Sequence, residues 1–422
     1  MELPRIFKKV FPKESYNEHK LRKYFSELTK YVQLFMAHRI FESNKKLVNE
    51  QTALYLNHQN NYHALEKYHR DAIRKNEENK IKGLKSYKQK SDLLHQLYFH
   101  PSFDKFPDGA EMLKANMESI DRELTLKKLF IACEAMNVSH FFNEEFAPSL
   151  LTEVQELVES FCKGEHPVFK IFLNLSYLLQ GNGDKKLFEA TMLLATNKSL
   201  LLEYEEHASC ISLLINHAAR EHRKTDDIFY LKKIHALNAF GLYKKMFIHR
   251  KKINESTFTN ISNTASMIGE YNFASNFISD YQQYLDEKIR QKTVALAQAY
   301  LLFHKQDYKT AYHKISNIPF ISLRYKLVAR TLIIQCLYEI QGEDPSFKQL
   351  LKRELVAFKR FIKKNKSWNE TRKNQYLIFV QVVDKIINNP DKKSIIEWLL
   401  RKSETNQPIM AKDWLMNKIN SL

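Results

Sequence analysis

The chain has 422 residues, a formal net charge of +18 at pH 7, and only 8 Gly and 10 Pro. So few turn-forming residues exclude a sheet-rich domain, because tight hairpins and bulges consume Gly, Asn and Asp. Good helix formers fill most segments, and apolar residues recur at three- and four-residue spacing, which predicts amphipathic helices along the chain. The charge favours anionic partners, but the Lys residues are interspersed with 48 acidic residues, so a solvated surface also accounts for it.

The cysteines and the N-terminus indicate the cellular compartment in which the protein is expected. The four cysteines lie far apart in or beside apolar helical stretches, without a C-x-x-C pair. They are Cys133, Cys162, Cys210 and Cys336. This pattern predicts buried free thiols in a reducing compartment. The N-terminus lacks the apolar core of a signal peptide, and no apolar run reaches the roughly 18 residues that span a bilayer. We therefore expect a cytoplasmic protein without membrane contact.

Long helices are predicted in the first 148 residues. A short amphipathic segment over 3–11 comes first. Ser15 and Glu18 then form a capping-box pattern, which predicts that a helix begins at Ser15 and runs towards Phe41. The predicted apolar stripe of this helix is Leu21, Phe25, Leu28, Val32, Phe35 and Met36. Further helices are predicted over 45–57, 61–79, 80–99 and 110–136. A loop over 100–109 is predicted from two prolines and a glycine.

After Pro148 the apolar pattern becomes regular and predicts paired helices. The predicted pairs are 149–163 with 167–180, 184–196 with 200–220, 226–249 with 255–268, 271–284 with 287–304, 307–316 with 321–341, 346–365 with 370–388, and 391–402 with 408–420. The predicted organisation is a helical region over 1–148, a repeat array over 149–402 and a C-terminal capping helix within 403–422. The predicted fold class is all-α, as an α-solenoid of antiparallel hairpins.

Internal repetition is the most specific signal in the sequence. Tyr271-x-x-Ala274 recurs as Tyr308-x-x-Ala311, which gives a period of 308 − 271 = 37 residues. Phe347 with Leu350 and Leu187 with Ala190 hold similar places in further copies. A small residue at a helix crossing lets two helices approach closely, and the aromatic residue seals the turn. Several such matches, each preceded by an apolar helix, predict stacked helical hairpins.

These motifs resemble those of the tetratricopeptide-repeat superfamily over roughly residues 166–402. The repeats exceed the usual length of about 34 residues, and the early Trp and the Leu-Gly pair of that family are missing. The whole chain also resembles an uncharacterised bacterial family of helical-repeat proteins. The resemblance implies a solenoid fold and a binding role, and it implies no activity.

No catalytic, cofactor or metal motif stands out. The segment Gly181-Asn-Gly-Asp-Lys-Lys186 has neither the preceding strand nor the hydroxyl residue of a phosphate loop, so a turn between helices is predicted. Neighbouring histidines such as His217 and His222 are five or more residues apart and share no helical face. The expectation is a protein that is not an enzyme and needs no cofactor. An enzyme whose catalytic residues meet only in the fold stays an alternative.

Basic clusters form a candidate patch for an anionic partner. Its residues are Lys244, Lys245, Arg250, Lys251 and Lys252, and Lys359, Arg360, Lys363 and Lys364. Aromatic residues beside such clusters, for example Tyr243, can stack on bases.

The leading hypothesis is a scaffold that binds a protein or peptide along the first helices of its hairpins. Gln298, Tyr300 and His304 are the candidate groove residues and are expected to be exposed. A nucleic-acid-binding protein that uses the basic clusters is the alternative.

Overall fold

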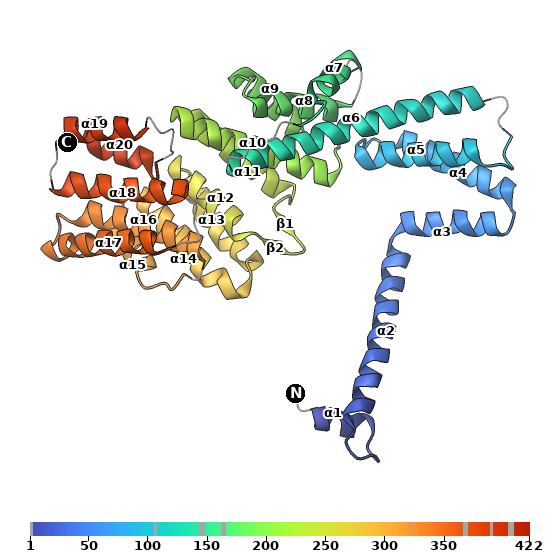
Figure 1. Ribbon diagram of the computed structural model, residues 1–422, viewed down its shortest axis with the longest axis horizontal. Coiled ribbons are helices and arrows are strands. Elements are labelled where there is room, and N and C mark those ends of the chain that lie inside the picture. The colour runs from blue at the N-terminus through green and yellow to red at the C-terminus, as the bar shows by residue number, and fades with distance from the viewer. Residues whose placement is uncertain are drawn as a thin grey trace. The chain divides into compact units, whose positions relative to one another are not determined.

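The computed structural model describes residues 3–104, 108–142, 148–161, 166–320, 322–365, 370–388, 391–403 and 409–422. These residues form twenty α-helices, one short 3-10 helix and one two-stranded hairpin, so the protein is all-α (Figure 1). The chain divides into two compact units, Met1–Lys127 and Lys128–Leu422, which we call unit 1 and unit 2. The division falls inside one long helix, α6 (Gly109–Phe142), whereas the sequence placed a boundary after residue 148.

Unit 1 contains five complete helices and the beginning of α6. They are α1 (Leu3–Val10), α2 (Glu18–Ser43), α3 (Lys45–His58), α4 (Tyr62–Glu78) and α5 (Leu84–Phe99). Helix α4 packs against both α3 and α5. Leu65, Leu94 and Leu97 form a small core with Phe103 and Met112, and Ser91 Oγ donates a hydrogen bond of 2.9 Å to Asn116 Oδ1 beneath it.

Helix α2 departs from its prediction in two respects. It begins at Glu18, and its N-cap is Asn17, whose Oδ1 accepts a 3.0 Å hydrogen bond from Lys20 N. The prediction that it begins at Ser15 is wrong, because Asn caps a helix as well as Ser does and lies closer to the helical segment. The predicted apolar stripe also stays exposed beyond Leu21: Leu28 is 56% and Phe35 is 64% exposed.

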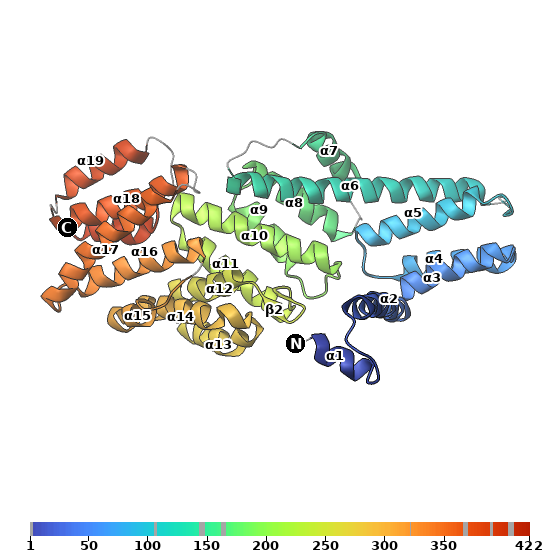
Figure 2. The same cartoon turned by 60° about the horizontal axis from the view of Figure 1, so that its bottom comes forward.

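Unit 2 continues from α6 through a series of helices in which neighbours along the chain pack side by side (Figures 1 and 2). They are α7 (Leu151–Phe161), α8 (Pro167–Gln180), α9 (Lys185–Ala195), α10 (Tyr204–Thr225), α11 (Ile228–Tyr243), β1 (Ile248–His249), β2 (Lys252–Ile253), α12 (Glu255–Met267), α13 (Tyr271–Tyr281), η1 (Gln282–Tyr284), α14 (Glu287–His304), α15 (Tyr308–Ile315), α16 (Leu323–Ile340), α17 (Pro345–Lys364), α18 (Glu370–Asn388), α19 (Lys392–Ser403) and α20 (Lys412–Asn420).

Unit 2 buries apolar residues in several clusters along this series. Helix α8 buries ten of its 14 residues, because α7, α9 and α10 pack around it. At the other end, Glu339 of α16 accepts two 2.7 Å hydrogen bonds, one from Trp414 Nε1 and one from Lys418 Nζ, which hold α20 against α16.

The cysteines that the structure describes are buried in unit 2. Cys133, Cys210 and Cys336 are free thiols, as predicted, and burial raises the pKa of each. Cys162 lies outside the described residues.

Two of the sequence motifs coincide with the beginnings of helices. Helices α13 and α15 begin at Tyr271 and Tyr308, and Ala274 and Ala311 are fully buried against the neighbouring helices. Tyr271 also donates a 2.7 Å hydrogen bond to the backbone oxygen of His304, which links α13 to the end of α14. The other copies differ, because Ala190 is exposed and Leu350 is only half-buried.

Because Ala274 and Ala311 are buried and Ala190 is exposed, Ala→Leu is expected to affect stability differently at these positions. Ala274→Leu and Ala311→Leu each insert three carbon atoms into a filled helix crossing, so each is expected to lower the free energy of unfolding by about 1–3 kcal/mol. Ala190→Leu adds the same atoms at an exposed site and should change it by less than about 0.5 kcal/mol. Urea unfolding checks this through Trp fluorescence, which reports on unit 2 because Trp368, Trp398 and Trp414 all belong to it. Equal effects at all three positions would contradict the packing role of the two alanines.

Candidate functional site

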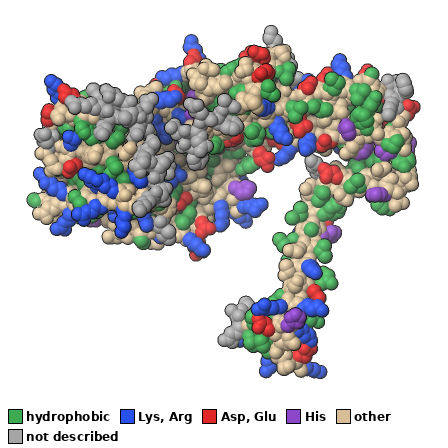
Figure 3. Space-filling view, in the orientation of Figure 1, with side chains coloured by type: hydrophobic (Ala, Val, Ile, Leu, Met, Phe, Trp, Pro, Cys, Tyr) green, Lys and Arg blue, Asp and Glu red, His purple; other side chains and the backbone are tan. Residues whose placement is uncertain are grey.

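Seven exposed cations lie along α17. The side chains of Lys348, Lys352, Arg353, Lys359, Arg360, Lys363 and Lys364 are all exposed. None of these seven forms an ion pair with a described residue. Figure 3 shows the Lys and Arg side chains gathered over this part of unit 2. Four of these residues belong to the candidate patch predicted from the sequence. The prediction missed Lys348, although it lies four residues before Lys352 and thus about one helical turn away.

A cavity of about 460 Å³ lies beside these cations. It is lined by α15, the loop after α15, α16 and α17, and most of the residues that line it are apolar, with Ile318, Phe320, Ile333, Leu350 and Phe361 among them. Three charged side chains, Lys326, Arg330 and Glu354, also line it. Arg330 Nη1 is 3.7 Å from Glu354 Oε1, and the Arg330 guanidinium lies 5.1 Å from the centre of the Phe361 ring. Burial raises the pKa of the Glu354 carboxyl, and the nearby Arg330 charge partly offsets this effect.

The position of each α17 residue around the helix follows from the helical period. At 100° per residue, the cavity-lining Leu350, Glu354 and Phe361 fall within about 40° of one another. Arg353, Arg360 and Lys364 form a second row centred about 80° away, and Lys348, Lys352 and Lys359 a third row centred about 160° away. We call these the near row and the far row. The near row therefore borders the cavity, and the far row points away from it.

The three predicted groove residues lie on α14 and are half-buried, so the expected exposure is not met. His304 Nε2 is 3.2 Å from Asn263 Oδ1 on α12, and burial lowers the pKa of His304 to about 4. Burial also raises the pKa of the Tyr300 hydroxyl. Tyr300 and His304 thus contribute to packing inside unit 2.

The other basic cluster lies on a β-hairpin, which corrects a prediction. Helix α11 ends at Tyr243, whereas the sequence predicted a helix over 226–249. His249 pairs with Lys252, and the two-residue turn between them is Arg250-Lys251 with φ of +48° and +62°. Such a turn requires left-handed backbone, which costs free energy for residues other than Gly, Asn and Asp.

The hairpin leaves only part of this cluster available to a partner. Lys252 Nζ forms a 2.8 Å ion pair with Asp286 Oδ2, and Lys244 lies 5.9 Å from the centre of the Phe240 ring. Lys245, Arg250 and Lys251 stay exposed. Figures 1 and 2 both show the hairpin and α17 on different sides of unit 2, so the two predicted basic clusters do not form one patch.

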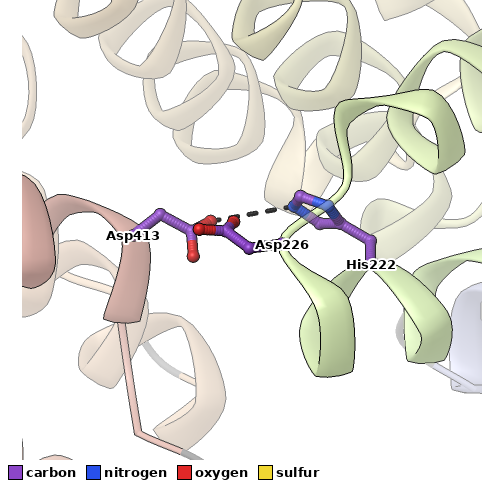
Figure 4. Close-up of side chains that lie close together, drawn as sticks. All are labelled: His222, Asp226 and Asp413. Atoms are coloured by element: carbon purple, nitrogen blue, oxygen red, sulfur yellow. Dashed lines mark ion pairs between the residues drawn. The ribbon is translucent and has the colours of Figure 1, made fainter.

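The fold also brings together one group that the sequence did not reveal. His222 and Asp226 at the end of α10 meet Asp413 of α20, and their ligand atoms all lie within 4.8 Å of one another (Figure 4). His222 Nε2 is 3.7 Å from Asp413 Oδ2, and its Nδ1 is 3.2 Å from the backbone oxygen of Asp227. Burial and the hydrogen-bonded Asp226 carboxyl raise the pKa of Asp413.

The group of His222, Asp226 and Asp413 has too few ligands for a metal site. Zinc takes four ligands and calcium six or more, and the described residues offer three here. A proton shared between the two carboxyl groups reduces their repulsion without an ion. We therefore interpret the group as a contact that ties α20 to the end of α10.

In comparisons with known protein families, curated proteins and solved structures, nothing matches this chain. None of the helices in the described ranges combines the length and the apolar character that a bilayer span requires. The fold thus defines an all-α protein, and its strongest candidate site is the group of exposed cations on α17 beside the cavity.

Proposed function

We propose that the chain is a non-enzymatic helical-repeat protein of the tetratricopeptide-like kind that holds a peptide segment of a partner protein in the cytoplasm. Two observations support the repeat architecture: the shared Tyr-x-x-Ala beginning of α13 and α15, and the packing of each helix from α12 to α18 against its neighbours in the chain. Stacked hairpins present extended surfaces for partners. The buried free thiols fit a reducing compartment.

The observation that carries the proposal is the juxtaposition of the near row with the apolar cavity. Arg353 follows Leu350 by three residues, and Lys364 follows Phe361 by three, so each cation is a helical neighbour of a cavity wall. A peptide that buries apolar side chains in the cavity gains about 25 cal/mol per Å² of apolar surface. Its carboxylates can then pair with the near row, where no described acidic residue competes. The ligand class is therefore an acidic peptide with apolar side chains.

The second candidate is a nucleic-acid-binding protein. The exposed hairpin tip, with Arg250 and Lys251, and the seven cations of α17 favour it. However, a phosphate backbone would use the near and far rows alike, and it would leave the apolar cavity unfilled. The peptide hypothesis explains the cavity and the cations together.

The two candidates separate by charge reversal on α17. We expect Arg353→Glu/Arg360→Glu/Lys364→Glu to weaken peptide binding by at least about tenfold, because each exposed ion pair contributes up to about 1 kcal/mol. The probe is the family of peptides that display selection from a random library enriches on the full wild-type chain. These peptides should combine Glu or Asp with apolar residues.

The matched control is Lys348→Glu/Lys352→Glu/Lys359→Glu, which changes the net charge equally on the far row. It should bind the selected peptides within about twofold of the wild type, apart from long-range screening effects. Equal losses in both variants, or selected peptides without acidic residues, would contradict the proposal. Equal losses of RNA binding in both variants would favour the nucleic-acid alternative.

A further inference from the structure

Unit 1 contains a cavity that the proposed function does not use. Its volume is about 570 Å³, within the range of sites for small organic ligands. It lies among α3, α4 and α5, and His100 and Pro101 after α5 also line it. In Figure 3 hydrophobic and His side chains share the surface over these helices. Leu54 and Phe99, which are 51% and 57% exposed, give it apolar walls that a ligand would cover.

The charge of this cavity is opposite to that of the chain. The sequence carries 66 Lys and Arg, yet none of the described side chains that line the cavity is Lys or Arg. Glu50 and Asp92 contribute carboxylates from α3 and α5. Such a site attracts cations and repels anions, against the net charge of the protein.

The most deeply buried imidazole of the cavity, His69, adds no positive charge. His69 is only 5% exposed, and its Nδ1 has no hydrogen-bond partner. Burial, with a contribution from His100, lowers the pKa of His69, so it is neutral at pH 7. His100 Nδ1 accepts a 3.2 Å hydrogen bond from Ser102 N, which leaves the ring proton on Nε2, 3.2 Å from Asn57 Oδ1. His69 therefore brings to the cavity wall a neutral ring whose Nδ1 has no hydrogen-bond partner among the described residues.

Two aromatic rings complete the wall. Tyr68 and Phe99 line the cavity together with Asp92. An ammonium group placed between a carboxylate and an aromatic face gains both Coulomb and cation–π attraction. An anionic or purely apolar ligand gains neither.

We propose that the cavity among α3, α4 and α5 of unit 1 binds an organic ammonium compound with an apolar body. The ammonium group lies against Asp92 and the aromatic rings, the apolar body covers Leu54 and Leu65, and the buried His69 ring faces the ligand.

The experiment compares three probes that share one body and differ in charge: 4-phenylbutylamine, 4-phenylbutanol and 4-phenylbutanoate. Binding to the full chain at pH 7 is measured by isothermal titration calorimetry. The amine should bind at least about tenfold more tightly than the carboxylate, with the alcohol between them. A carboxylate that binds as tightly as the amine, or the absence of amine binding at millimolar concentration, would overturn the proposal.

Variants test the location. Asp92→Asn, at an exposed position, should weaken binding of the amine by about fivefold and leave the affinity for the alcohol unchanged. Glu78→Gln removes an exposed carboxylate of α4 outside the cavity, and it should leave all three probes unchanged. Ala53→Trp fills the cavity and should abolish binding of every probe. Amine binding that survives Ala53→Trp in a chain with an unchanged unfolding midpoint would place the ligand elsewhere and refute the site.

Discussion

Lowering the pH from about 7 to about 4.5 is expected to destabilise unit 2 by several kcal/mol. His217 and His304 dominate this effect, because burial lowers the pKa of each to about 4, with help from the Arg220 charge at His217. His217 is 5% exposed and stacks on Phe188 with 5.6 Å between ring centres. Burial lowers the pKa of His207 and His235 in the same direction.

The sign follows from where the protons bind. Between the ordinary pKa of 6.5 and about 4, the unfolded chain binds a proton at each histidine and the folded chain does not. Stability contributed by the neutral rings is therefore present above pH 6.5 and is lost as the pH falls towards 4. The difference amounts to on the order of 3 kcal/mol for each histidine. Glu354 and Asp413, whose pKa values burial raises, oppose this trend only in part.

Urea unfolding followed by Trp fluorescence at both pH values measures the effect in unit 2. His217→Asn and His304→Asn should each reduce the pH dependence of the free energy of unfolding, whatever they do to its absolute value. His58→Asn, at an exposed position in unit 1, is the control and should leave it unchanged. A wild-type stability that is flat between these pH values would show that the two rings are not held neutral.

Phe172→Ala is expected to lower the free energy of unfolding of unit 2 by about 3–5 kcal/mol. Phe172 is 0% exposed at the centre of α8, and its ring meets Phe130 edge-on with 5.4 Å between ring centres. The substitution leaves a cavity that α7, α9 and α10 cannot close without breaking their own contacts with α8.

The control for this substitution is Leu193→Ala on the neighbouring helix α9. Leu193 is 75% exposed, so its truncation should change the free energy of unfolding by less than about 0.5 kcal/mol. The same fluorescence-detected urea unfolding measures both variants. A loss below about 1 kcal/mol for Phe172→Ala would mean that α8 is not central to the core of unit 2.

The sequence predicted the helices of unit 2 well where apolar spacing and caps agree. The ranges 167–180 and 287–304 coincide with α8 and α14, and α13 begins at the predicted Tyr271. It failed at α11, since the apolar spacing continues through Phe247 while the chain reverses in a turn of Arg and Lys. A pattern of residue types does not reveal left-handed backbone at residues that rarely adopt it.

The candidate sites were predictable only where they depend on a single helix. The cluster of Lys359, Arg360, Lys363 and Lys364 was visible in the sequence because these residues lie close together along one helix, α17. The cavity beside them needs α15, α16 and α17 together, and the contact of Asp226 with Asp413 joins residues 413 − 226 = 187 positions apart. Burial of Tyr300 and His304 depends likewise on neighbouring helices, so the expectation that they are exposed had no local signal to correct it.

The proposed peptide-holding role is tested most directly by the salt dependence of binding. Fluorescence anisotropy compares a labelled display-selected peptide with a labelled single-stranded RNA, each titrated with the full chain at about 50 and about 200 mM salt. A protein that uses six or more phosphate contacts loses about 10³-fold or more in affinity over this range. We expect the peptide to bind more tightly than the RNA at the higher salt, with a loss of less than about tenfold, because the apolar cavity carries part of its affinity. Tighter RNA binding at both salt concentrations, with the steep loss that phosphate contacts produce, would contradict the proposed role.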